Sequence, residues 1–307
     1  MAPRHAHHSH AHHGPGTDVR ALGVALGLIV GFMVAEVVVA ALSGSLALLA
    51  DAGHMLTDAG ALAVAIWAAR LALRPASVTM TYGFKRVEIL SAALNGLTLV
   101  VVSALITFEA VRRIVHPGAV DGTALVVVAA SGVVVNAAAT AALGRTDRSR
   151  LNIAGAFAHL ITDLWAFVAT LIAGIVILAT GFARADAVAS LVAVVLMGRA
   201  AWGLLRRSAV ILLEGTPEGV DLDVVRSHLL GLPEVASVHD LHVWVVTSDL
   251  PAVSAHVVVN DECFANGLAP CVLDQMQACL AGHFDVEHST FQLEPAGHID
   301  HEHAPHD

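Results

Sequence analysis

Six long apolar segments constrain this chain more than any other feature of its sequence. A bilayer-spanning helix needs about 20 consecutive apolar residues. Lipid offers no partner for backbone N–H and C=O groups, so such segments must be helical. The chain is 56% hydrophobic with a mean hydropathy of +0.73, which is too apolar for an ordinary soluble domain. The predicted spans lie near residues 20–42, 46–72, 88–110, 122–144, 152–179 and 186–205.

Basic residues between the predicted spans indicate how the chain is oriented. Lys and Arg are concentrated in the cytoplasmic loops of membrane proteins. The loops after the second and fourth spans, and the end of the sixth, are rich in arginine, whereas the opposite side carries Arg112, Arg113 and Arg184. We therefore expect both termini to be cytoplasmic, with Arg112 and Arg113 as a modest exception to the rule.

The composition changes after the last predicted span. From residue 211 onward acidic residues are frequent and Arg226 is the single basic residue, within a chain of net charge −10. This balance favours cations and argues against nucleic acid as a partner. Helix-like and strand-like segments follow in the order αββαβ, at 219–230, 235–247, 251–260, 265–282 and 288–294. The sequence thus predicts a membrane all-α bundle of six transmembrane helices plus a small cytoplasmic α+β domain.

The chain divides into four predicted regions. They are a disordered His-rich tail at 1–17, a membrane domain at 18–210, a cytoplasmic domain at 211–295 and a His-rich tail at 296–307. Flexible His tracts bind divalent metals with little selectivity, so the tails either buffer metal or have no essential role. The cysteines are odd in number and not closely paired, which predicts a reducing compartment rather than a disulfide framework. They are Cys263, Cys271 and Cys279.

A His-x-x-x-Asp pattern occurs twice inside the predicted spans, as His54 to Asp58 in the second and His159 to Asp163 in the fifth. Residues four apart lie on one face of a helix, so each imidazole has a carboxylate neighbour. Ionisable groups within a bilayer are costly and usually functional. Two imidazoles and two carboxylates form a four-ligand set that suits tetrahedral Zn²⁺. The two motifs therefore predict a divalent metal site at membrane depth.

The ligand types also bear on how such a site would work. Asp and His bind Zn²⁺ less tightly than a set of thiolates, which suits an ion that must leave again. A metal must displace protons from these ligands to bind, so proton coupling is inherent in them. The alternative is that each pair is a hydrogen bond that packs two helices. Asp51, three residues before His54, either orients His54 or contacts another span.

A second group of histidines lies in the predicted cytoplasmic strands. His239, Asp240 and His242 fall on the first strand, His256 on the second and His288 at the start of the third. Neighbouring strands could bring such residues together, and a bound divalent ion would reduce the repulsion between two acidic domains. The alternative for each histidine is a satisfied structural residue. The three cysteines are more readily explained by packing than by metal binding.

Six sequence runs together resemble the cation diffusion facilitator family, in the zinc-type branch that includes cobalt–zinc–cadmium resistance efflux proteins. The resemblance covers nearly the whole chain. The runs are SGSLALLADAGHMLTD at 43–58, YGFKRVEIL at 82–90, LNIAGAFAH at 151–159, LEGTP at 213–217, HDLHVW at 239–244 and HSTFQLE at 288–294.

The resemblance implies a homodimeric metal/proton antiporter with six spans per subunit and a ferredoxin-like cytoplasmic domain, in a bacterial-type inner membrane. It places the transport site on His54, Asp58, His159 and Asp163. In the family, His at the start of each motif goes with a preference for zinc. The chain is accordingly expected to export Zn²⁺, with Cd²⁺ or Co²⁺ as further cargo, and to need no prosthetic group.

The resemblance also implies, more loosely, a secondary cytoplasmic metal site at His239, His256 and His288. One departure is clear, because some members carry Asp and His ligands in the loop between the second and third spans. Residues 70–87 of this chain contain neither residue type. We therefore expect that accessory site to be absent.

Two rival functions stay open at this point. One is a membrane-anchored metal sensor, although an anchor has no use for ligands inside the bilayer. The other is a membrane acyltransferase or metallohydrolase. Acyltransferase motifs have one His-x-x-x-x-Asp near the interface, whereas the spacing here is one residue shorter and occurs twice. The sequence also lacks a His-Glu-x-x-His zinc-protease motif and a P-loop, which argues against the enzymatic reading.

Overall fold

The computed structural model describes residues 15–43, 46–116, 121–144, 146, 150–248, 250–284, 286 and 288–298. Within the helices, the side chains of residues 15–18, 40, 42–43 and 46–54 lie outside the described set. The chain forms two compact units, Met1–Leu205 and Arg206–Asp307.

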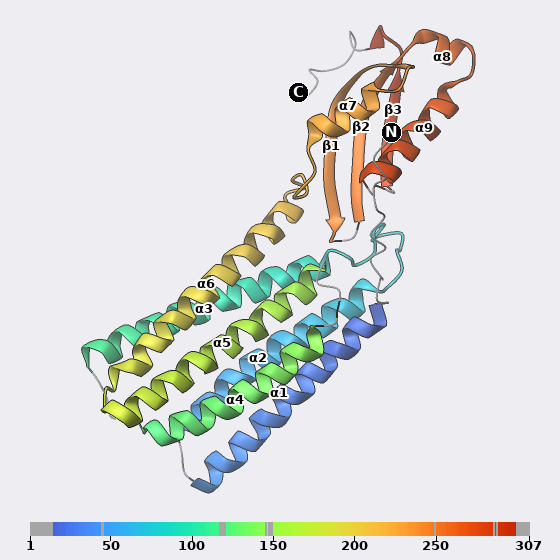
Figure 1. The fold of residues 1–307 in the computed structure, drawn as a ribbon. Coiled ribbons are helices and arrows are strands. Elements are labelled where there is room, and N and C mark those ends of the chain that lie inside the picture. The colour runs from blue at the N-terminus through green and yellow to red at the C-terminus, as the bar shows by residue number, and fades with distance from the viewer. Residues whose placement is uncertain are drawn as a thin grey trace, which may run out of the picture. The chain divides into compact units, whose positions relative to one another are not determined.

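Six helices in the described part of the chain are long and apolar enough to cross a membrane (Figure 1). They are α1 (Pro15–Ser43), α2 (Leu46–Ala72), α3 (Val87–Val115), α4 (Gly122–Leu143), α5 (Leu151–Thr180) and α6 (Arg184–Leu212). The six predicted spans are confirmed. Helices α1, α3 and α6 continue past the apolar runs because helical hydrogen bonding does not end where hydrophobicity ends.

Local residues set the ends of these helices. Asp121 begins α4, where its carboxylate accepts hydrogen bonds from the backbone N–H groups of Thr123 and Ala124 at 2.9 and 3.2 Å. Such a cap satisfies donors that have no partner within the helix. Gly181 ends α5 in the left-handed region at φ +69°, which a residue without a Cβ adopts at little cost.

The membrane helices pack through small residues. Helix α1 contacts α2 and α4, and α5 contacts α2, α3 and α4. A Cβ added to Gly132 on α4 would lie 2.4 Å from the ring of Phe167 on α5, and one on Gly174 would lie 2.7 Å from Val126. Such contacts allow helix backbones to approach closely where lipid supplies no hydrophobic drive.

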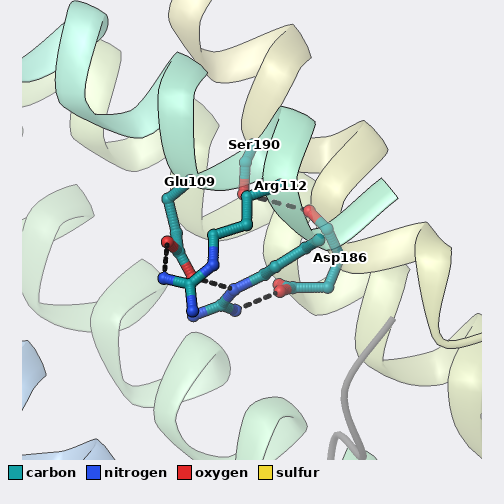
Figure 2. A network of polar contacts seen from close by, with 5 residues as sticks. Glu109, Arg112, Asp186 and Ser190 are labelled. Atoms are coloured by element: carbon teal, nitrogen blue, oxygen red, sulfur yellow. Dashed lines mark hydrogen bonds and ion pairs between the residues drawn. The ribbon is translucent and has the colours of Figure 1, made fainter. Parts of the chain in front are cut away.

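A charge network joins the end of α3 to the start of α6 (Figure 2). The Arg113 guanidinium contacts Asp186 Oδ2 and Glu109 Oε1, each at 2.9 Å, and Arg112 lies 3.7 Å from Glu109. Ser190 donates to the backbone carbonyl of Asp186 at 3.0 Å. These partners explain why two arginines occur on the side that the positive-inside rule leaves poor in them. Their charges are matched locally by two carboxylates.

The second unit is a small α+β domain. Its elements are α7 (Leu222–Leu230), β1 (Val235–Thr247), β2 (Leu250–Val259), α8 (Asp261–Ala265), α9 (Ala269–Phe284) and β3 (His288–Glu294). The sheet has the order β1-β2-β3, with β2 antiparallel to β1 and parallel to β3. The predicted α+β class is confirmed. The short helix α8 was not predicted, and α9 begins at Ala269 with Pro270 in its first turn, where its missing N–H costs nothing.

Alternation along the strands separates the two faces of this sheet. Val253, Ala255, Val257 and Val259 of β2 are buried in one core with residues of α7 and α9. Successive strand residues point to opposite faces. His256 therefore lies on the face that the core leaves free.

Candidate metal centres

Three ionisable side chains meet inside the membrane unit. His159 Nε2 on α5 lies 2.9 Å from Asp58 Oδ1 on α2 and 3.5 Å from Asp163 Oδ2 on its own helix. All three residues are at most 5% exposed. One ring nitrogen thus faces two carboxylates, and the three ligand atoms lie within 4.8 Å of one another.

Helix geometry accounts for this meeting. His159 and Asp163 are four residues apart on α5, so their side chains share a face, and that face packs on α2 where Asp58 lies. Met55 and Leu160 are fully or nearly fully buried in the surrounding apolar core. The two helices therefore bring together both residues of the second predicted motif, His159 and Asp163, with Asp58 of the first.

The group has the chemistry of a divalent-cation site. An imidazole nitrogen and two carboxylate oxygens are ligands that Zn²⁺ accepts. Two carboxylates taken out of water need a positive partner, which either a proton on the imidazole or a metal ion can supply. The same three atoms can thus hold a proton or a cation, and the two compete for them.

The fourth predicted ligand, His54, lies on α2 four residues before Asp58. Asp51, predicted to orient it, lies on the same helix. The side chains of these two residues lie outside the described set, so their roles stay predictions.

A second group lies in the cytoplasmic unit. His239 and Asp240 of β1 and His256 of β2 have ligand atoms within 4.8 Å of one another, and the two rings are 5.1 Å apart. Glu294, at the end of β3, lies between the imidazoles, 3.2 Å from His239 Nε2 and 2.9 Å from His256 Nδ1. Gln292 donates to the same carboxylate at 2.8 Å.

A β-bulge explains how Asp240 joins this group. Adjacent residues of a regular strand point to opposite faces, which would separate Asp240 from His239. The β1–β2 register breaks between His239 and His242, and Asp240 adopts the left-handed region at φ 46°. A bulge re-aims a side chain, and the strained backbone persists because the flanking ladder holds it. The sequence pattern alone gives no sign of this bulge.

The third predicted cytoplasmic ligand, His288, lies elsewhere on the sheet. It pairs with Ala252, whereas His256 pairs with Gln292, four residues further along β3. That separation is about 13 Å along a strand. Within one chain His288 does not join the group. Glu294 does join it, although it was not among the residues predicted from the sequence. Parallel pairing of β2 with β3 brings Glu294 there, and the pairing cannot be read from the strand sequences.

The remaining metal-capable residues are scattered. His242 is exposed on β1, and the histidines of the two tails lie outside the described residues except for His298. Cys263, Cys271 and Cys279 are free thiols, of which Cys263 is buried. Burial raises the pKa of the Cys279 thiol.

Comparison with known proteins gives matches along nearly the whole chain. Residues 22–213 match the cation efflux transmembrane domain, and residues 217–296 match the cytoplasmic domain of cation efflux proteins. The metal cation efflux system protein CzcD of Cupriavidus metallidurans is 41% identical over 95% of this chain and 90% of its own length. The zinc transporter ZitB of Escherichia coli is 38% identical over 96% of this chain and 93% of its own length.

A solved structure also matches, the metal-bound C-terminal domain of the CzcD transporter. It is 39% identical, covers 24% of this chain and 99% of that chain, and has a TM-score of 0.22.

The two family matches and the two full-length relatives agree with the sequence-based resemblance. They confirm a multi-pass membrane protein whose C-terminal domain is cytoplasmic, and a transporter rather than an enzyme. With a buried Asp58–His159–Asp163 group in its membrane helices, the chain belongs to the cation efflux family of transporters, also called cation diffusion facilitators.

Proposed function

We propose that this protein exports Zn²⁺, and with it Cd²⁺ or Co²⁺, from the cytoplasm in exchange for protons. The cargo ion binds Asp58, His159 and Asp163, with His54 as the fourth ligand. The observation that carries the proposal is the single nitrogen of His159 between two carboxylates, at 2.9 and 3.5 Å, inside membrane-spanning helices. The names of relatives add support, since one is a zinc transporter and another a cadmium, cobalt and zinc/H(+)-K(+) antiporter.

Exchange follows from competition for one set of ligands. A metal ion arriving from the cytoplasm displaces the proton on the His159 imidazole and takes its place between the carboxylates. The loaded and protonated forms then favour different helix arrangements, because a cation and a proton make different contacts with the three ligands. Protons that enter from the other side return to the ligands and release the ion. The proton gradient supplies the driving force.

The wider setting belongs to the same proposal. We place the protein in the inner membrane as a homodimer with cytoplasmic termini. Asp51 accepts a hydrogen bond from His54 and orients it, as a neighbouring carboxylate does for many metal-bound imidazoles. Zinc is the cargo and no prosthetic group is needed.

The cytoplasmic group gives zinc a second role as a regulatory ligand. His239, Asp240 and His256 provide two nitrogens and an oxygen on a partly exposed sheet face, and Glu294 holds the two rings in place. A bound ion would lower the acidic charge of this domain and favour its approach to a second copy. This group is also the observation that favours the alternative function, a metal sensor that binds metal without transporting it.

The test is Zn²⁺ flux into proteoliposomes under an imposed pH gradient. Wild type is compared with Asp163→Asn, which removes one ligand charge at constant shape. Asp121→Asn is the matched control, because Asp121 caps α4 away from the group and an Asn side chain can cap equally well. Proton-dependent flux that is lost in Asp163→Asn and kept in Asp121→Asn supports the carrier. Metal binding without flux in wild type supports the sensor, and undiminished flux in Asp163→Asn overturns the proposed site.

A further inference from the structure

A buried amide links three helices next to the membrane metal group. Asn152, in the first turn of α5, is 0% exposed. Its Nδ2 donates to the backbone carbonyl of Ala65 on α2 at 2.8 Å, and its Oδ1 accepts from Ser91 on α3 at 2.9 Å. The three helices α2, α3 and α5 also contact one another pairwise (Figure 1).

The position of this amide relative to the metal group is regular. Asn152 lies seven residues before His159 on α5, and Ala65 lies seven residues after Asp58 on the antiparallel helix α2. Seven residues are two helical turns, so both contacts lie on the same α2–α5 interface, about 10 Å apart. The Asn152–Ala65 bond is the one nearer the cytoplasm, because α5 begins there. The two helices are thus joined at two levels.

The two levels differ in chemistry. The contact between His159 and Asp58 must be remade whenever a metal ion or a proton arrives or leaves. The amide of Asn152 neither titrates nor competes for Zn²⁺ with carboxylates and imidazoles. An unsatisfied amide is costly where no water is at hand, so both of its bonds favour one register of the three helices. A slip of α5 by one turn, 5.4 Å, would break them both.

Neighbouring residues reinforce this register. Arg150 lies 3.5 Å from Glu88 at the cytoplasmic ends of α5 and α3. Gly155 lets α5 approach its neighbours, since a Cβ there would lie 3.2 Å from Leu204 and 3.8 Å from the Ala92 Cα. Asn152 lies between these two features in the sequence of α5.

We propose that Asn152 is a positioning residue of the transporter: it fixes the register of α5 against α2, so that His159 and Asp163 meet Asp58 in ligand geometry. This inference rests on the proposed function, because it assigns Asn152 to the same site. Loss of the amide lets α5 shift and weakens cargo binding. A residue that served folding alone would change the amount of intact protein without changing the affinity of that protein for Zn²⁺.

The test compares variants of full-length protein in two assays, Zn²⁺ flux in proteoliposomes and Zn²⁺ binding to the detergent-solubilised chain. Asn152→Leu keeps the branched shape of the side chain and removes both hydrogen bonds. Ser91→Ala removes one of them. Asn136→Ala is the matched control, because Asn136 is equally buried on α4 but donates to the Gly132 carbonyl of its own helix.

We expect Asn152→Leu to raise the KM for Zn²⁺ about tenfold and to change the maximal rate per folded molecule less than about threefold. Ser91→Ala should raise KM by a smaller factor, about threefold, and Asn136→Ala should leave it unchanged. An unchanged KM in intact Asn152→Leu overturns the inference, as does a lower maximal rate at constant KM. If Asn152→Leu does not fold, Asn152→Asp and Ser91→Ala decide by the same criterion.

Binding separates this inference from the proposed function. If wild type binds Zn²⁺ but carries none, the proposed transport fails, while the affinity ratio of wild type to Asn152→Leu still tests Asn152. If wild type transports Zn²⁺ but Asn152→Leu has the same KM and the same affinity for Zn²⁺ as wild type, the proposed function is supported and the positioning role of Asn152 is overturned.

Discussion

The membrane group and the cytoplasmic group use the same two residue types in inverted proportion. In the membrane set one imidazole, His159, accompanies the carboxylates of Asp58 and Asp163, whereas in the cytoplasmic set of His239, Asp240 and His256 two imidazoles accompany one carboxylate. The His159 side chain is 5% exposed and that of His256 is 29% exposed. The difference follows from where each group meets its ion.

An excess of carboxylate suits a site that must always hold a cation. Two buried carboxylates are stable at membrane depth when a proton or a metal ion accompanies them, so the group alternates between the two. The cytoplasmic set has no such requirement, since it lies at a partly exposed surface where water can solvate its groups when no ion is bound. The first arrangement fits exchange of cargo, and the second fits equilibrium with free metal in the cytoplasm.

Replacing His159 should have the greatest effect on transport. His159→Ala removes the nitrogen that both membrane carboxylates share, and we expect Zn²⁺ flux to fall about a hundredfold or more. His239→Ala removes one imidazole of the cytoplasmic group and should leave the maximal flux within about threefold of wild type. Flux of ⁶⁵Zn into proteoliposomes, normalised to folded protein, measures both. Equal losses in the two variants would mean that the groups do not have separate roles.

Proton release should distinguish the groups next. In a His239→Ala, His256→Ala background, the part of Zn²⁺ binding that is lost on adding Asp163→Asn reports on the membrane group, where we expect the ion to displace a proton from His159. We expect each bound ion to release at least one proton. For each proton released, the affinity for Zn²⁺ should fall about tenfold when the pH is lowered by one unit. Calorimetry in buffers of different ionisation enthalpy counts the protons. Binding without proton release would contradict exchange at this group.

Glu294→Gln probes the cytoplasmic group alone. The Glu294 carboxylate is 1% exposed and contacts both imidazoles, so its charge orients the rings that would bind the ion. Loss of such a partner costs about tenfold or more in metal affinity. We expect the cytoplasmic ion to bind about tenfold more weakly while flux at saturating Zn²⁺ is retained. Unchanged affinity would indicate that Glu294 does not orient the histidines.

Features set by residues close together in the sequence could be predicted, whereas contacts between residues distant in the sequence could not. The membrane helices could be predicted because apolar length is a local property, and Asp58, His159 and Asp163 could be predicted because helical spacing fixes their faces. Glu294 was not predicted, because parallel pairing of β2 with β3 decides its neighbours, and Asp240 was named on the first strand without the bulge that turns it toward His239 and His256. The contacts of Asn152 could not be predicted either. Its partners Ala65 and Ser91 are distant in sequence, and Ala65 contributes only a backbone carbonyl.

The thiols of the cytoplasmic unit can report on metal binding there. Cys263 is 2% exposed within the core behind the sheet, so alkylation requires local opening. An ion bound at His239 and His256 stabilises the closed form and should slow Cys263 alkylation about fivefold when free metal is a few times its Kd. His159→Ala should show the same slowing, and His256→Ala should show none. Mass spectrometry of the labelled peptides measures the rate.

Two further thiols provide the controls for this measurement. Cys271 is exposed and should react at one rate with or without metal. Cys279 should react more slowly than Cys271 near neutral pH, because burial raises the pKa of its thiol and leaves less thiolate at a given pH. Its rate should rise as pH is raised toward that pKa. Metal protection of Cys263 that disappears in His159→Ala would show that the membrane group, and not the sheet face, controls the stability of the cytoplasmic unit. That outcome would mean that the two groups are energetically coupled, with the membrane group affecting the cytoplasmic unit.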